Sequence, residues 1–291
     1  MDVGKAGGGG APESAEARVS LAALCDDLLA ETELLDDLVR PLDDAGWHTP
    51  TPAAGWTIRD QVVHLARSDE AARLSAVEPD AFMRWREEVR RDRDAVIARL
   101  SAEDRHKSGP EVLAWLHSAR RQLVDAVRDL DPKQRVPWFG PDMTIVSSVT
   151  ARIMETWAHG QDCFDALHVE HPSSGNLRHV ALIGTLTFGN SFRAKGREVP
   201  DVRVRVELDA PDGGVWTFGS ADATEIVRGT AEDFCLVVTQ RRHVDDTDLV
   251  AEGHVTAEWL MIAQAYAGTG GPGRRPGQFP RRPRRPPRST G

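Results

Sequence analysis

Residues 145–167 read IVSSVTARIMETWAHGQDCFDAL. Apolar side chains recur through this stretch at helical spacing, which predicts one helix that is largely buried. Glu155 and His159 are four residues apart and therefore stack on one face of that helix, and Asp162 continues the same face. A buried carboxylate is very costly without a partner or a metal ion. This polar face is therefore the first candidate for chemistry.

Three more helices are predicted before this one. Leucines recur at helical spacing over about residues 19–42, and a second helix is predicted over about 57–76, with Thr57 as its N-cap. A third helix starts at Pro110, and the polar helical stretch at about 80–100 is expected outside the core. Four amphipathic helices joined in this way predict an all-α four-helix bundle.

The pattern changes after residue 172. Residues 202–208, VRVRVEL, alternate strictly and predict a strand, and a turn at 211–214 with a return strand at 215–218 predicts a hairpin. The bundle is therefore followed by a small α+β domain. Its other predicted elements are helices at about 176–192, 231–240 and 257–267 and strands near 226–227 and 249–252.

These patterns divide the chain of 291 residues into two folded domains, 18–172 and 173–267. Residues 1–17 contain no apolar core, so we expect a disordered leader rather than a secretory signal. Residues 268–291 are mostly Gly, Pro and Arg, and we expect this tail to be disordered as well.

The composition narrows the class of protein. The net charge is −9 although the tail carries seven arginines and no acid, so the body is strongly acidic and nucleic acid is not an expected partner. No apolar run approaches the ~20 residues that span a bilayer. The three cysteines are far apart, which argues against disulfides and fits a cytoplasmic protein. We expect a monomer or homodimer acting on a small molecule.

A carboxylate and an imidazole four residues apart can take adjacent positions around one divalent ion, most readily zinc, and also nickel or iron. The same spacing is also typical of a solvated ion pair on a helix. His64 lies on the shoulder of the apolar arc of the second helix, where a core histidine is the usual interpretation. Adjacent helices of a bundle can nevertheless bring it opposite the last helix.

Two stretches resemble a known family. Residues 49–65, TPTPAAGWTIRDQVVHL, together with Glu155-x-x-x-His159-x-x-Asp162, resemble the DinB/YfiT-like metalloenzyme superfamily and, more closely, the mycothiol-dependent maleylpyruvate isomerases. Residues 136–141, VPWFGP, with 154–162 resemble an actinobacterial branch known mainly as metal-binding proteins. The resemblance covers roughly residues 18–275, and the second domain resembles the sterol-carrier-like domain of those isomerases.

The resemblance implies a zinc ion on His64, Glu155 and His159, with the fourth position open to activate the thiol of mycothiol. It also implies that Arg241 lies near the site and pairs with a substrate carboxylate. Where relatives often have Gly-Arg, this chain has Gln-Arg. Alternatively, Arg241 and Arg242 only cap the helix that precedes them.

Other side chains have two interpretations each. Asp162 could accept a hydrogen bond from His159 or another metal ligand and so orient it, or accept a bond from a neighbouring helix. Trp138 and Phe139 could line the pocket as part of the cofactor-binding wall, or only cover the end of the bundle core. Cys163 is predicted to point away from the ion, which leaves the site open.

We therefore predict a metal-dependent enzyme with mycothiol as its thiol cofactor. It would be an isomerase or an S-transferase that acts on a small electrophilic or anionic metabolite. One alternative is a thiol-independent enzyme in which the ion acts as a Lewis acid on a carbonyl. Another is a non-catalytic protein that binds a metal or small ligand.

Overall fold

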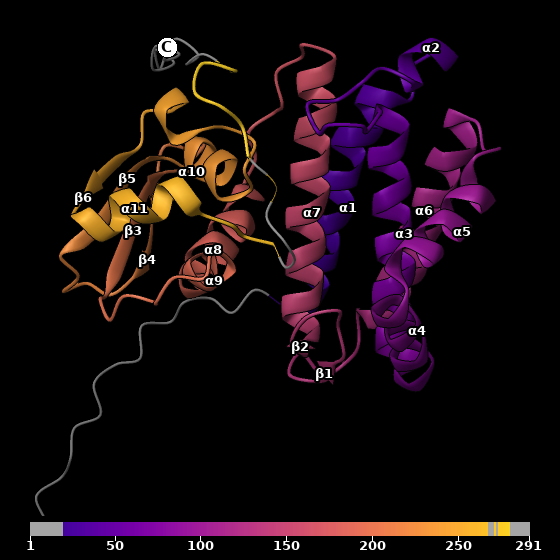
Figure 1. The fold of residues 1–291 in the computed structure, drawn as a ribbon, viewed down its shortest axis with the longest axis horizontal. Helices are drawn as coiled ribbons and strands as arrows, with labels where there is room; N and C mark the ends of the chain where they lie inside the picture. Colours follow the sequence, from indigo (N-terminus) through magenta and orange to yellow (C-terminus); the bar gives the residue numbers. More distant parts are fainter. Residues whose placement is uncertain (1–19, 267–270, 272, 280–291) are drawn as a thin grey trace, which may run out of the picture.

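The structure is a computed structural model that describes residues 20–266, Gly271 and residues 273–279. It consists of a helical part, indigo to magenta in Figure 1, and an α+β part, orange to yellow, which lies against α7. This confirms the predicted order of a helical domain followed by a small α+β domain. The predicted leader, residues 1–17, lies outside the described residues.

Four long helices dominate the helical part. They are α1 (Leu21–Val39), α3 (Ile58–Val77), α6 (Gly109–Val127) and α7 (Ile145–Ala166). The helix α3 packs on both α6 and α7, and α1 packs on α7. Each agrees with a predicted helix to within a few residues, because the apolar spacing that marks a helix is also what lets it pack.

The start of α3 shows why the sequence folds in this way locally. The side chain of Thr57 accepts a hydrogen bond from the backbone N–H of Asp60, and the Asp60 carboxylate accepts one from the backbone N–H of Thr57 at 2.8 Å. This reciprocal capping box satisfies donors that the helix itself leaves free. It fixes where α3 begins, and therefore which way His64, about two turns further on, points.

A buried arginine joins all four long helices. Arg120 on α6 is 1% exposed and its Nε donates to Asp69 Oδ2 on α3 at 2.5 Å. Its two terminal nitrogens donate to the hydroxyl groups of Thr32 on α1, at 2.6 Å, and Thr156 on α7, at 3.0 Å. The guanidinium therefore fixes the register of the helices relative to one another.

The segment between α3 and α6 forms two helices rather than one, α4 (Pro79–Arg91) and α5 (Arg93–Asp104). They separate at Asp92, whose carboxylate accepts a hydrogen bond from the N–H of Ala95 and caps α5. Both are mostly exposed, as expected. A short helix, α2 (Asp44–Trp47), and a small hairpin of β1 (Arg135–Val136) and β2 (Met143–Thr144) were not predicted.

The α+β part contains a four-stranded sheet in the order β4-β3-β5-β6. The predicted hairpin is present as the antiparallel pair β3 and β4, whereas β5 runs parallel to β3 and β6 antiparallel to β5. The predicted helix at 176–192 is broken at Thr187, whose hydroxyl bonds back to the carbonyl of Ile183. The elements are α8 (Leu177–Leu186), α9 (Phe188–Ala194), β3 (Val204–Asp209), β4 (Val215–Gly219), β5 (Glu225–Thr230), α10 (Ala231–Val238), β6 (Val250–Glu252) and α11 (His254–Ile262).

The helix α7 serves both parts of the molecule. Met154, Trp157 and Ala158 on its outer face belong to the hydrophobic core of the α+β part. Polar contacts add to this interface, for example between His179 Nε2 and Asp27 Oδ2 at 2.8 Å. The face with Glu155 and His159 is a different one, because it turns toward α3 within the helical part.

Of the predicted tail from residue 268, the structure describes Gly271 and residues 273–279, and these contact the body of the protein. Arg274 Nη2 donates to Asp162 Oδ1 on α7 at 2.6 Å, and the N–H of Gly277 donates to Asp246 at 2.7 Å. The ring of Phe279 lies 4.1 Å from the guanidinium carbon of Arg242. The composition of a segment shows how few apolar side chains it can bury. It does not show that Arg274 can pair with the buried carboxylate of Asp162.

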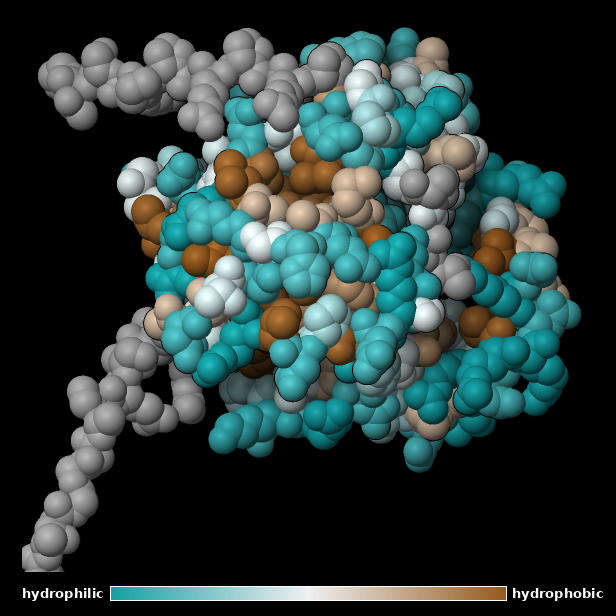
Figure 2. Space-filling view, turned by 60° about the vertical axis from the view of Figure 1, so that its left-hand side comes forward, coloured by the Kyte–Doolittle hydropathy of each residue, from teal (hydrophilic) through white to brown (hydrophobic). Residues whose placement is uncertain are grey.

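The surface agrees with a charged, polar composition. Figure 2 brings the α+β part forward and shows a mainly hydrophilic surface with apolar side chains in separate patches. The most exposed large apolar side chains of this part are Leu186, Val215, Met261 and Val250. Among the described residues, no helix combines the length and apolarity that crossing a membrane requires.

The buried pair of Arg120 and Asp69 generates a stability prediction. Arg120→Ala leaves Asp69 as an unpaired buried carboxylate, so we expect it to lower the free energy of unfolding by about 3–5 kcal/mol in urea denaturation. The control is Arg121→Ala, because Arg121 is exposed, and its effect should stay within about 0.5 kcal/mol. Equal losses in the two variants would show that the buried pair has no special role.

Candidate metal centre

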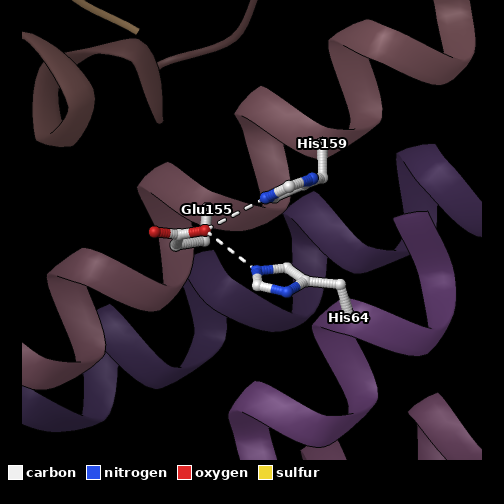
Figure 3. Close-up of side chains that lie close together, drawn as sticks. All are labelled: His64, Glu155 and His159. Atoms are coloured by element: carbon white, nitrogen blue, oxygen red, sulfur yellow. Dashed lines mark hydrogen bonds and ion pairs between the residues drawn. The ribbon is translucent and has the colours of Figure 1, made fainter. Parts of the chain in front are cut away.

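Three side chains from two helices converge at one point. His64 on α3 lies opposite Glu155 and His159 on α7 (Figure 3). Glu155 Oε2 lies 3.4 Å from His64 Nε2 and 3.1 Å from His159 Nε2. One ligand atom from each residue lies within 4.8 Å of the others, so a single ion could contact all three. The structure thus brings together the three residues that the sequence analysis selected as ligands.

A chain of hydrogen bonds fixes the ring of His159. The Thr51 hydroxyl donates to the carbonyl of Trp56 at 2.9 Å, and it accepts from Gln61 Nε2 at 2.8 Å. The other end of the Gln61 amide, Oε1, therefore faces His159 Nδ1, 2.5 Å away. Because an amide oxygen only accepts, Nδ1 must carry the proton, and Nε2 of the neutral ring holds a lone pair.

That lone pair points at a carboxylate oxygen, which also only accepts. Two acceptors 3.1 Å apart repel each other unless a cation lies between them. Burial, with a smaller effect from the neighbouring His64, lowers the pKa of His159 to about 4. At neutral pH the imidazole is therefore not protonated, and a proton does not lie between the two acceptors. A divalent ion suits this arrangement.

The protonation state of Glu155 also suits a metal ligand. Burial alone would raise its pKa, but the contacts with His159 and His64 and the positive charge of Arg152 outweigh burial and hold the pKa well below the usual value. Its other oxygen, Oε1, faces Arg152 Nη2 at 4.0 Å, which leaves Oε2 directed at the two imidazoles. A carboxylate and neutral imidazoles are the forms in which these groups bind a metal.

The site is reachable from solvent. The side chains of His64, Glu155 and His159 are 36%, 19% and 14% exposed. Trp56 lies beside them, with its ring 5.8 Å from His159 and nearly parallel to it, and 5.5 Å from His64. Three protein ligands with an accessible side leave a coordination position for a small molecule, as catalytic zinc sites do.

Arg241 lies beside this centre. It follows α10, and its Nε donates to the carbonyl of Ala158 at 3.0 Å, while Nη2 donates to Asp162 Oδ2 at 2.9 Å. It also bonds to the carbonyl of Thr239 near the end of α10, so the capping interpretation holds in part. The preceding residue, Gln240, has φ 61°, a left-handed conformation that favours glycine.

Asp162 differs from its predicted role as an orienter of His159. Its partners among the described residues are Arg241 and Arg274, and the acceptor on His159 Nδ1 is Gln61. The reason is geometric, because α7 directs Asp162 toward the α+β part while His159 faces α3.

Trp138 and Phe139 lie away from the ligands. The Trp138 ring stacks on Phe82 at 5.7 Å, Phe139 lies 5.2 Å from the same ring, and Phe139 is 42% exposed. Between Trp138 and Glu155 stands Arg152, whose guanidinium carbon is 5.4 Å from the Trp138 ring. This favours the interpretation that the two rings cover the end of the helical core.

Cys163 and His117 lie in other environments. Cys163 is fully buried in an apolar cluster of the helical part, and burial strongly raises the pKa of its thiol. His117 Nε2 lies 3.0 Å from Asp36 Oδ1 on α1. Sequence reasoning missed Gln61, Trp56 and Arg152. The first two stand in the quoted stretch 49–65, which was the available signal.

Comparisons with known proteins show which family this chain resembles. Residues 28–164 match the family model of the mycothiol maleylpyruvate isomerase N-terminal domain. An uncharacterized protein found in two strains of Mycobacterium tuberculosis is 38% identical over 248 residues, which covers 85% of this chain and 96% of the relative.

Crystal structures of a mycothiol-dependent maleylpyruvate isomerase and of its histidine-to-alanine mutant are similar at a TM-score of 0.50 and 15% identity. The similarity covers 80% of this chain and 96% of those chains. At this identity, the similarity shows a shared fold.

The convergence of the three ligands predicts how metal content responds to substitution. Purified protein should hold about one divalent ion per chain, and His64→Ala, Glu155→Ala or His159→Ala should each remove most of it, as measured by elemental analysis. Gln61→Ala should weaken the affinity by about 10–100-fold, because the His159 ring loses its acceptor. His117→Ala is the matched control. Full occupancy in all three ligand variants would exclude the site.

Proposed function

Because the chain belongs to the mycothiol-dependent maleylpyruvate isomerase family, we propose that it is a metal-dependent isomerase or S-transferase that uses mycothiol. The metal would be held by His64, Glu155 and His159, with zinc as the preferred ion because its usual ligands are of these types. The substrate would be a small electrophilic and anionic metabolite. We place the reaction in the cytoplasm. We also propose that the helical part is a DinB-like four-helix bundle and that the α+β part is a sterol-carrier-like domain.

The observation that carries this proposal is the lone-pair arrangement around Glu155 Oε2. Two imidazoles on separate helices, of which that of His159 is neutral, face one ionised oxygen, and the site has a side open to solvent. A divalent ion bound there would lower the pKa of a coordinated thiol, so that the reactive thiolate is present at neutral pH.

The cysteines of the protein support the need for an external thiol. All three are buried, and burial raises the pKa of Cys25 to about 11 and shifts those of Cys163 and Cys235 upward as well. A thiol nucleophile must be deprotonated and accessible, and these are neither. A sulfur nucleophile at this site would therefore have to come from a small-molecule thiol.

The surrounding residues have definite tasks in this proposal. Gln61 holds the His159 ring in the tautomer that leaves Nε2 free, and Arg152 faces the oxygen of Glu155 that the ion does not use. Arg241 places a positive charge about one turn along α7 from His159, where it could pair with a substrate carboxylate. Trp56 offers an aromatic surface beside both imidazoles.

Cobalt substitution tests the proposal. With Co²⁺ in the site, mycothiol should produce sulfur-to-cobalt charge-transfer absorption, because the thiolate takes the open position. Cys163→Ser should leave this absorption intact.

Two outcomes would contradict the proposal. Thiolate absorption before any thiol is added, lost in Cys163→Ser, would mean that the protein closes its own site. Cobalt protein that never shows thiolate absorption, even at high mycothiol, would exclude thiol activation and favour a Lewis-acid or binding role.

A further inference from the structure

We propose that Arg274, on the C-terminal segment that contacts α7, is a second substrate-binding arginine, which together with Arg241 holds a carboxylate group of the substrate. The inference rests on the proposed function, in that it places this carboxylate beside the metal centre. It adds to that function a residue from a segment whose composition predicted disorder. In Figure 1 the yellow segment after α11 runs between the α+β part and α7.

Both arginines are held by one carboxylate. Asp162 is 1% exposed, and it accepts from Arg241 Nη2 on Oδ2 at 2.9 Å and from Arg274 Nη2 on Oδ1 at 2.6 Å. The two guanidinium groups therefore lie on either side of the same side chain, each 12% exposed. Their positions are fixed before any ligand arrives, which lowers the entropy cost of binding.

The charges around Asp162 do not cancel. Arg242 is matched by Asp165 in a bidentate pair, with both N–O distances 2.7 Å. Among the described residues, Asp162 is the one carboxylate bonded to Arg241 and Arg274, and Asp165 is already paired with Arg242, so this group of five side chains has one positive charge in excess. The negative charge of Glu155 does not balance this excess, because the proposed divalent ion already neutralises it. An anionic group of a ligand would complete the balance.

Arg274 also has unused hydrogen-bonding capacity. Its Nε is buried and has no hydrogen-bond partner among the described residues. Burial lowers the pKa of Arg274, and the charge of Arg241 acts in the same direction against the opposing effect of Asp162. A buried donor without an acceptor is costly. A carboxylate, whose two oxygens match the planar fork of a guanidinium, would satisfy it.

The pair of arginines acts on the same region as the metal ligands. The hydroxyl of Tyr266, which donates to Gln240 Oε1, has its pKa raised mainly by burial, and the charges of Arg241, Glu155 and Arg274 all act on it. Arg241 Nε donates to the carbonyl of Ala158, the residue before His159, and both arginines bond to Asp162 on the same helix, so a ligand bound to the arginines would also lie near the metal.

The test is calorimetric titration of the full-length, metal-loaded protein with maleate, a small dicarboxylate, alongside its uncharged diamide. We expect Arg274→Ala to weaken maleate binding at least about tenfold, the effect of losing one hydrogen bond to a charged group. Arg274→Lys keeps the charge and should lie between this variant and the original protein. Arg275→Ala is the matched control, because its side chain is exposed on the same segment, and it should bind maleate normally.

A merely structural role for Arg274 makes different predictions. Metal content and melting temperature should stay close to those of the original protein in Arg274→Ala, and the cobalt–mycothiol absorption should persist. If that variant binds maleate normally, if it loses the metal together with maleate, or if Arg275→Ala loses as much binding, the inference is wrong. It is also wrong if the original protein prefers the diamide or binds no maleate. Arg274-dependent maleate binding without any cobalt–thiolate absorption would instead reject the proposed function and keep the anion site.

Discussion

The arrangement of the helical part depends on the hydrogen bonds and the ion pair of Arg120. Its guanidinium, buried on α6, donates to Asp69 on α3, to a threonine on α1 and to Thr156 on α7. Asp69 lies little more than one turn from His64, and Thr156 directly follows Glu155. The charged network therefore holds α3 and α7 at the register in which an imidazole meets a carboxylate. Apolar packing alone would tolerate a shift between helices more readily than a buried ion pair does.

The second constraint is that α7 must satisfy two neighbours. Its apolar outer face belongs to the core of the α+β part, and its polar face turns toward α3. Asp162 lies between them and draws Arg241 and Arg274 onto the helix beside the metal ligands. The proposed metal site and the proposed anion site are thus both on α7, so that a thiol and an anionic substrate could be oriented relative to each other without a moving element.

The sequence predicted what depends on local pattern. The stripe of Glu155 and His159 on α7 and the capping box of Thr57 are periodic or short-range features, and the structure has both. Gln61 and Arg152 were missed because their roles depend on the side chain that another helix brings opposite them. Arg274 was placed in a disordered tail because composition measures apolar area, whereas this segment is held by charge pairing and an aromatic contact.

We propose that one ion is bound by two imidazoles and a carboxylate, with no sulfur from the protein. X-ray absorption spectroscopy of the zinc-loaded protein tests this most directly. It should show only nitrogen and oxygen neighbours at about 2.0–2.2 Å, and a sulfur neighbour at about 2.3 Å should arise only after mycothiol is added. A sulfur neighbour before any thiol is added, or a first shell that His64→Ala and His159→Ala leave unchanged, would contradict the account.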